Sequence, residues 1–147
     1  MLAVQKLCKA VEYLVDRWGP VEGRTRLMKL IYLADLDWAV GHGGQPYTEA
    51  HYYRWNHGPF SREVLRALEW MDGIEIVEVT TSWEQGELHR YRSGDRTRLH
   101  KVNLDNDFKA ILDKVGSQWR HRPLRDLLDH VYTRKQFKDK VFGEPLL

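Results

Sequence analysis

The sequence has a single cysteine among its 147 residues, Cys8, which excludes an internal disulfide and a zinc site built from several cysteines. Cys8 falls among apolar residues in a helical pattern, which indicates a buried, unreactive thiol. The longest apolar run, residues 30–34, is far shorter than the roughly 20 residues that cross a bilayer. The first residues also show no signal-peptide pattern. We therefore expect a cytoplasmic protein with no membrane segment.

A strong net charge is also absent. Lysine and arginine number 23 and aspartate and glutamate 21, a formal charge of +2, so overall charge does not select a partner. One local segment, residues 90–101, holds five basic residues against one acidic residue. Two interpretations stay open for it: a solvated hairpin arm, which we favour, or a surface that meets phosphate or an acidic partner.

Length and composition predict one globular domain over residues 1–147. Apolar spacing predicts a mainly α (α+β) fold: a compact domain of about five helices with one β-hairpin after the third helix. The second helix is apolar on nearly all sides, so we expect it at the centre of the core. The expected helices cover residues 2–18, 25–38 with Thr25 as N-cap, 62–71 with Ser61 as N-cap, about 105–115 ending at Gly116, and 123–132, and the hairpin strands cover 74–82 and 87–92.

Sequence patterns for catalysis are missing. There is no nucleophile elbow, phosphate-binding loop or dinucleotide fingerprint, and the seven histidines show no metal-ligand spacing. We therefore expect no metal, no cofactor and no enzymatic activity. The alternative that stays open is a site assembled across loops, for instance from Asp35, His51 and His57.

Aromatic residues are unusually frequent, with six tryptophans and seven tyrosines. Tyr47, Tyr52, Tyr53 and Trp55 all lie between the second and third predicted helices. Rings with polar tips are typical of protein interfaces, but they also cover the core of a small protein. Both interpretations stay open, and we expect these rings to gather into one platform.

Two segments carry a family resemblance. The first is Leu27-Met28-Lys29-Leu30-Ile31-Tyr32-Leu33-Ala34-Asp35, and the second is Gly44-Gln45-Pro46-Tyr47-Thr48 followed by Tyr53-Arg54-Trp55-Asn56-His57-Gly58-Pro59-Phe60-Ser61-Arg62-Glu63-Val64. In order and spacing they resemble the Panacea domain, the antitoxin domain of bacterial, archaeal and phage toxin–antitoxin pairs. The resemblance covers residues 24 to about 70.

The resemblance implies a compact helical domain with a small β element. It also implies a protein that binds and neutralises a cognate toxin, usually the product of an adjacent gene. One branch of the family instead presents its toxin to a protease as an adaptor, so this role stays open. The target and the oligomeric state are not predicted.

Residue roles divide into two groups. Six residues are expected to be mainly architectural, with Tyr32 and Asp35 hydrogen-bonding a neighbouring segment and the Gly-Pro turn aiming the third helix. The architectural group is Lys29, Tyr32, Asp35, Gly58, Pro59 and Ser61. The predicted partner-binding group is Tyr47, Tyr53, Trp55, His57, Trp83, Arg90 and Arg92.

A nucleic-acid-binding protein, such as a regulator of its own operon, is the less favoured alternative. Three helices followed by a hairpin is also the order of a winged helix-turn-helix. Against it, the third helix carries both Arg62 and Arg66 and both Glu63 and Glu69, whereas a helix that faces phosphates is expected to be basic.

Overall fold

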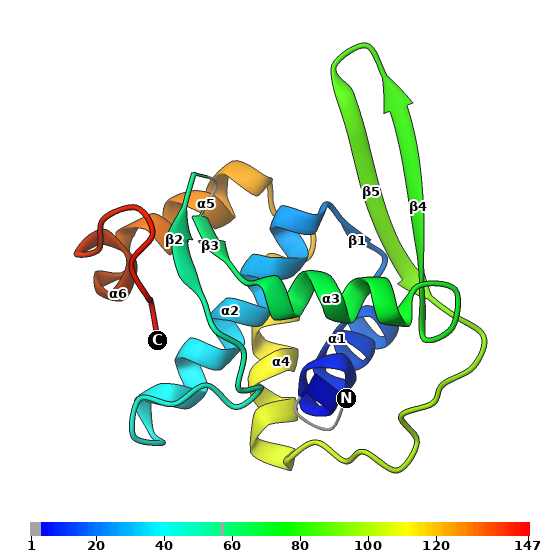
Figure 1. Cartoon of the computed structure of the whole chain (residues 1–147), viewed down its shortest axis with the longest axis horizontal. Helices are drawn as coiled ribbons and strands as arrows, with labels where there is room; N and C mark the ends of the chain where they lie inside the picture. The colour runs from blue at the N-terminus through cyan, green and yellow to red at the C-terminus, as the bar shows by residue number, and fades with distance from the viewer. Residues whose placement is uncertain (1–3, 57) are drawn as a thin grey trace.

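The computed structural model describes residues 4–56 and 58–147. Figure 1 shows helices gathered on one side and a long hairpin that projects from them. The helices are α1 (Gln5–Trp18), α2 (Arg24–Val40), α3 (Arg62–Met71), α4 (Asn106–Trp119), α5 (Leu124–Thr133) and the short α6 (Lys135–Lys138). The strands are β1 (Val21–Glu22), β2 (Tyr53–Trp55), β3 (Gly58–Phe60), β4 (Ile76–Trp83) and β5 (Gly86–Ser93).

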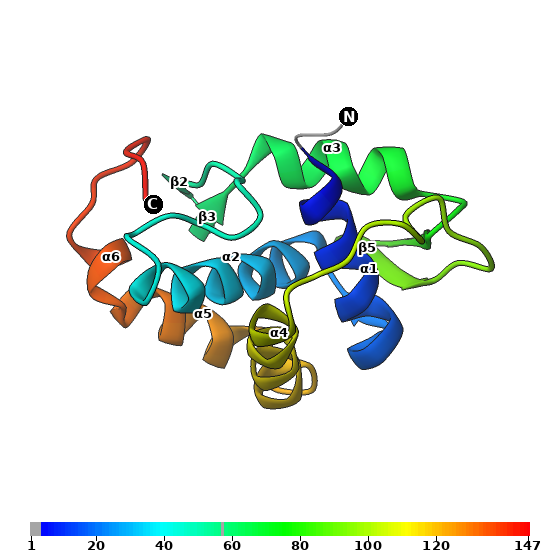
Figure 2. The same cartoon turned by 90° about the horizontal axis from the view of Figure 1, so that it is seen from below.

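Helix α2 runs through the middle of the helical layers. Eleven of its residues are buried, on all sides of the axis, which confirms the central position predicted from its apolar residues. Figure 2 shows α5 on one side of α2 and the β2–β3 pair on the other, with α3 continuing from that pair. Helices α1 and α4 cross near one end of α2 and pack against each other.

The start of α3 follows directly from its local sequence. Ser61 has an extended backbone and its hydroxyl accepts a hydrogen bond from the Val64 backbone N–H at 3.4 Å, as an N-cap residue does. The helix then covers the predicted residues and buries Val64, Leu68 and Met71. Ser61 therefore sets where α3 begins.

Two predicted helix boundaries are wrong. Helix α2 begins at Arg24 after Gly23, which has φ of 97°, and Thr25 lies inside its first turn instead of capping it. Gly116 does not end α4, which continues to Trp119. A Cβ at Gly116 would lie 2.5 Å from the Trp18 ring, so this glycine permits close packing of α4 on α1.

The prediction of one β-hairpin is wrong, because two antiparallel pairs are present in the described residues. The long β4–β5 pair follows α3, and β1 joins its β5 side to give the strand order β1-β5-β4. The short β2–β3 pair precedes α3, in a segment expected to be mostly loop. Strands of three residues are too short to show an alternating pattern in the sequence.

Cys8 is fully buried, and burial raises the pKa of its thiol to about 12. The burial that we expected for the Cys8 thiol is confirmed. None of the helices in the described part of the chain has the length and apolar character needed to cross a bilayer.

Candidate interaction surface

Asp35 anchors the aromatic segment to α2. Its buried carboxylate accepts hydrogen bonds from the Thr48 backbone N–H at 3.0 Å, the Thr48 hydroxyl at 2.5 Å and the Tyr52 hydroxyl at 2.6 Å. Burial raises the pKa of Asp35 from 3.8 to about 6, against the opposing effect of these hydrogen bonds. The expected hydrogen bond to a neighbouring segment is therefore made by Asp35.

Tyr32 does not make the second hydrogen bond that we expected. Its hydroxyl is buried and has no hydrogen-bond partner among the described residues. Its ring instead meets the Tyr52 ring edge-on, with centroids 5.1 Å apart. Tyr32 thus contributes to this part of the core through packing.

The rings between α2 and α3 do not form one platform, which corrects the prediction. Tyr52 is buried under the segment. Tyr47 turns toward α4, where its ring stacks on Phe108 at 4.1 Å and its hydroxyl accepts a hydrogen bond from the Asp105 backbone N–H at 2.9 Å. Among the described tyrosine, tryptophan and phenylalanine rings of this segment, Trp55 in β2 is the exposed one, and the Asp35 contacts hold the preceding part against α2.

Three rings form the exposed surface, which we call the aromatic patch: Trp55, Phe60 and Phe142. Trp55 stacks on Phe60 at 5.4 Å and lies 4.5 Å from Phe142, measured between ring centroids. Trp55 is 42% exposed and Phe142 57% exposed. The patch is therefore a contiguous apolar surface that remains open to solvent in the folded chain.

The backbone under the aromatic patch is fixed from two sides. Strand β2 pairs with β3 on one side, with Trp55 opposite Gly58. On its other side the C-terminal segment 143–146 runs along β2: the Gly143 N–H donates to the Arg54 carbonyl at 2.7 Å, and the Arg54 N–H donates to the Glu144 carbonyl at 2.9 Å. These hydrogen bonds bring Phe142 to Trp55 from the far end of the sequence.

The Gly58-Pro59 turn lies directly on a buried lysine. Gly58 has φ of 106°, and a Cβ there would lie 2.8 Å from Cε of Lys29. Lys29 is 1% exposed, and burial lowers the pKa of its ammonium group to about 8. Only glycine satisfies both the backbone conformation and the close approach. Pro59 is buried beside it in β3.

A hollow lies on each side of the aromatic patch. One, of about 280 Å³, is lined by Met28, Lys29, Gly58 and Leu65 together with Trp55 and Phe60. The other, of about 480 Å³, is lined by Tyr53, Arg62, Glu63, Arg66 and Gly143 together with the same two rings. Tyr53 is half-buried at this second hollow. The patch is thus apolar at its centre and bordered by two arginines of α3.

The remaining predicted partner-binding residues lie on the long hairpin. The register places Val79 opposite Arg90, Val77 opposite Arg92 and Trp83 opposite Gly86. Because side chains alternate along a strand, Trp83, Arg90 and Arg92 share one face of the hairpin. Trp83 is 47% exposed and lies at the end of β4 beside the tight turn.

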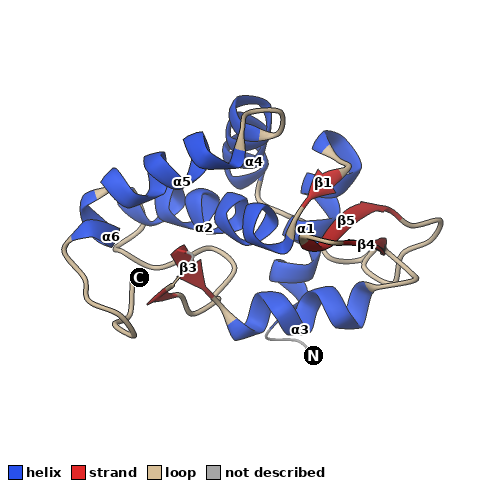
Figure 3. Ribbon diagram, turned by 90° about the horizontal axis from the view of Figure 1, so that it is seen from above, coloured by secondary structure: helices blue, strands red, loops and turns tan. Residues whose placement is uncertain are grey.

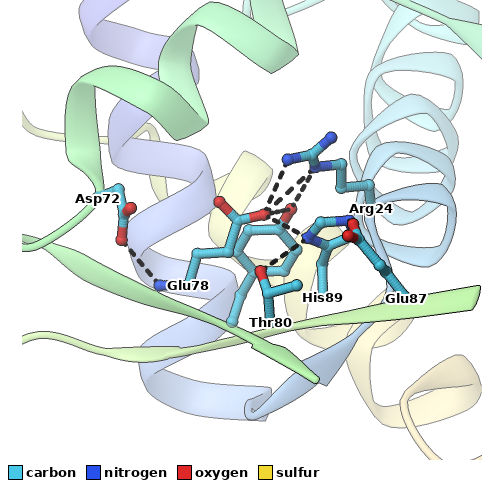
Figure 4. Close-up of polar contacts among 7 residues, drawn as sticks. Arg24, Asp72, Glu78, Thr80, Glu87 and His89 are labelled. Carbon is cyan, nitrogen blue, oxygen red and sulfur yellow. Dashed lines mark hydrogen bonds and ion pairs between the residues drawn. The ribbon is translucent and has the colours of Figure 1, made fainter. Parts of the chain in front are cut away.

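The opposite face of the hairpin is attached to α2 (Figure 4). The Glu78 carboxylate receives hydrogen bonds from the Arg24 guanidinium at 3.1 Å and the Tyr91 hydroxyl at 2.9 Å, and it lies 3.0 Å from Nδ1 of His89. The Glu78 backbone N–H donates to Asp72 at 2.8 Å. This network holds the base of the hairpin. On the other face Trp83 is exposed at the end of β4, and Arg90 lies 3.6 Å from the Glu22 carboxylate of β1.

Two residues of the alternative loop-built active site, Asp35 and His51, have different surroundings. Asp35 is enclosed by Thr48 and Tyr52, whereas His51 is exposed, with Nδ1 3.3 Å from the Glu63 carboxylate. His57 lies outside the described residues. Within the ranges 4–56 and 58–147, no group of three His, Cys, Asp or Glu side chains is arranged to hold a metal ion.

Phe60 and Phe142 are the members of the aromatic patch that sequence reasoning missed as binding residues. For Phe142 the signal is especially weak. The only available signal was an isolated aromatic residue within a polar C-terminal segment. Its contact with Trp55 depends on hydrogen bonds between segments far apart in the sequence, and no local pattern reveals these.

Comparison with protein families supports the resemblance. The family described as antitoxin SocA-like, Panacea domain, matches residues 27–137, most of the chain. No curated protein and no solved structure matches the chain. The matched range includes α2, β2, β3 and α3, which carry most of the candidate surface, and extends through α5. The chain belongs to the antitoxin SocA-like Panacea-domain family.

Proposed function

We propose that this chain is an antitoxin that neutralises a cognate toxin by binding it directly, and that the aromatic patch is part of the contact surface. The observation that carries this function is the solvent exposure of Trp55 and Phe142 on a backbone held from two sides. Tryptophan is prominent among residues that dominate binding energy at interfaces. The chain acts in this way by binding, without catalysis or a cofactor.

The surroundings of the aromatic patch define the chemistry of the partner. The two hollows can accept apolar side chains on either side of the Trp55 and Phe60 rings. Arg62 and Arg66 border one hollow, and both are exposed. Glu63 lines the same hollow, so the two arginines leave one positive charge in excess there. A toxin segment with apolar anchors and a neighbouring carboxylate fits this arrangement.

The test is co-expression with the toxin encoded by the adjacent reading frame. Trp55→Ala and Phe142→Ala each remove a ring from the patch, and Val141→Ala is the matched control because Val141 is 66% exposed beside Phe142. Truncating an anchor costs about 2 kcal/mol or more, which weakens Kd roughly thirtyfold. We expect both ring variants to lose growth rescue and the control to keep it.

Two outcomes would contradict direct binding through the aromatic patch. One is that the purified chain and the toxin form no complex and co-expression relieves no toxicity. The other is that Trp55→Ala and Phe142→Ala bind as tightly as the unaltered chain. In the second case Trp83→Ala would test the hairpin face as the contact surface instead.

Delivery of the toxin to a protease is the alternative way to neutralise it. An occluding antitoxin leaves the toxin level unchanged while activity falls, whereas an adaptor shortens the toxin's lifetime. A chase of toxin abundance after translation is blocked separates the two. We expect a stable toxin, because a patch fixed by backbone hydrogen bonds suits a long-lived complex.

One observation favours nucleic-acid binding as a second candidate function. Strand β1 lies between α1 and α2 and pairs with β5, so the strand order β1-β5-β4 resembles that of a winged helix, with the β2–β3 pair inserted between α2 and α3. However, the exposed face of α3 mixes Arg62 and Arg66 with Glu69. A salt-sensitive gel shift of duplex DNA from its own promoter would establish this role.

A further inference from the structure

A third hollow, away from the aromatic patch, is lined mainly by basic residues. It has a volume of about 450 Å³ and lies where β1, the first turn of α2, β5 and the α4–α5 connection meet. Figure 3 shows that connection at the same end of the molecule as β1. We call it the basic hollow, and its defining residues are Glu22, Arg26, Arg90, Arg120, Arg122 and Pro123.

The charges in the basic hollow are not balanced. Four guanidinium groups face one carboxylate, Glu22, which lies 3.6 Å from the Arg90 guanidinium. Among the described residues no carboxylate forms an ion pair with Arg26, Arg120 or Arg122. At least three positive charges of the hollow therefore lack a counterion within the part of the chain that the structure describes.

Backbone carbonyls hold two of these arginines in place. Nη1 of Arg26 donates to the Trp119 carbonyl at 3.0 Å, and Nη2 of Arg120 donates to the Gly19 carbonyl at 3.3 Å. Carbonyl oxygens orient a guanidinium group but carry no net charge. Nε of Arg120 is also buried without a hydrogen-bond partner among the described residues. The guanidinium groups are thus positioned by the fold while part of their bonding capacity is unused.

Burial makes this arrangement costly for the folded chain. It lowers the pKa of Arg26, which is the direction expected of a cation that is partly removed from water without full compensation. Neighbouring guanidinium groups also repel one another. A bound anion would relieve both costs.

The start of α5 adds to the positive potential of the basic hollow. Pro123 is the N-cap residue of this ten-residue helix and lines the hollow, and no side chain caps the helix. The helix dipole favours an anion at this end, and Asp126 in the first turn carries the opposite charge. The contribution of the dipole comes from the backbone and is independent of the arginine side chains.

We infer that the basic hollow binds a compact polyphosphate, such as the phosphate chain of a nucleotide. Guanidinium groups pair with phosphate oxygens through two parallel hydrogen bonds, and several arginines around one concave site match the several charges of a short phosphate chain. A carboxylate side chain of a partner protein carries only one negative charge, whereas a short phosphate chain carries several close together. This binding is separate from the proposed toxin contact, because the basic hollow shares no lining residue with the hollows beside the aromatic patch.

The test is calorimetric titration of the full chain with inorganic triphosphate at low salt. We expect one site per chain and a higher melting temperature when triphosphate is present. Arg90→Gln and Arg122→Gln, both exposed positions, should each weaken binding about tenfold or more. Arg96→Gln is the matched control, because Arg96 is exposed and does not line the hollow, and it should bind like the unaltered chain.

Stability without ligand gives a second readout that does not depend on binding. Arg122 has no ion pair among the described residues, and its guanidinium lies 5.2 Å from the Trp119 ring centroid at an exposed position. Arg122→Gln should therefore lower the melting temperature only slightly in phosphate-free buffer. It should also gain much less from added triphosphate. A variant that melts normally and fails to bind shows that the loss comes from the removed charge and not from unfolding.

Two further ligands identify the source of the phosphate group. If ATP and inorganic triphosphate bind with equal affinity, the site recognises the phosphates alone. If ATP binds more tightly, the site recognises a nucleotide. Either result supports the site. The inference is overturned if triphosphate does not bind at millimolar concentration or if Arg96→Gln weakens binding as much as Arg122→Gln. It is also overturned if duplex DNA displaces triphosphate and binds more tightly.

Discussion

Ionisation of Asp35 should make the folded chain less stable as pH rises from about 4 to about 6. The folded state raises the pKa of this buried carboxyl from 3.8 to about 6, so the unfolded chain releases the proton at a lower pH than the folded chain. A raised carboxyl pKa therefore favours folding only below that range. The whole shift corresponds to about 3 kcal/mol of unfolding free energy, of which about 2 kcal/mol is lost between pH 4 and pH 6.

The variant Asp35→Asn isolates this contribution. The amide cannot ionise, and its carbonyl oxygen can still accept the hydrogen bond from the Thr48 N–H, while the Thr48 and Tyr52 hydroxyls can turn to accept from the amide NH₂. At pH 4 the variant should be the less stable form, because it replaces a well-fitted carboxyl group. Its relative stability should then rise by about 2 kcal/mol by pH 7.

Urea unfolding followed by tryptophan fluorescence at pH 4, 5, 6 and 7 measures both proteins. The matched control is Asp95→Asn, at an exposed position, whose difference from the unaltered chain should stay constant with pH. A flat difference for Asp35→Asn across this range would show that folding does not shift this pKa, and a loss of relative stability as pH rises would show that folding stabilises the charged carboxylate; either result refutes the reasoning.

Three further substitutions test the packing that supports the candidate surface. Gly58→Ala forces a Cβ against Lys29 at a φ of 106° and should lower stability by about 2 kcal/mol or more in thermal unfolding. Gly116→Ala places a Cβ 2.5 Å from the Trp18 ring and should lower the free energy of unfolding by about 1–3 kcal/mol. An exposed helical glycine would instead gain stability from this change, so a gain would contradict the close contact. Ser61→Ala removes the N-cap of α3 and should cost about 1 kcal/mol, and an unchanged urea midpoint would show that the cap contributes nothing.

The elements that could be predicted are those whose signals are local. The extent of α3 follows from a Gly-Pro turn, the Ser61 cap and a run of apolar residues at helical spacing. The central position of α2 follows from apolar residues on all sides of its axis. In both cases neighbouring residues contain the information that fixes the structure.

The features that could not be predicted depend on contacts between distant segments. Hydrogen bonds from residues 143–146 complete the β2–β3 pair. Gly116 lies inside α4 where the helix packs on Trp18, whereas its residue type is also common just after a helix end. Likewise the basic hollow joins Arg26, Arg90 and Arg120 from three separate elements. The sequence showed only the excess of basic residues near Arg90. Partner contacts of Tyr47, Tyr53, Trp55, His57, Trp83, Arg90 and Arg92 stay predictions.

Helix α2 links the two candidate surfaces, so the surfaces need to be separated by substitutions that leave this helix intact. Lys29 supports the turn beside the aromatic patch and Arg26 lines the basic hollow, so a disturbance of α2 would affect both. Trp55→Ala and Arg122→Gln lie outside α2 and line different hollows. Distant sites with no shared partner act additively. Trp55→Ala should therefore lose toxin affinity and keep triphosphate affinity, and Arg122→Gln should do the reverse; loss of both by either variant would show that the two sites are coupled through the fold.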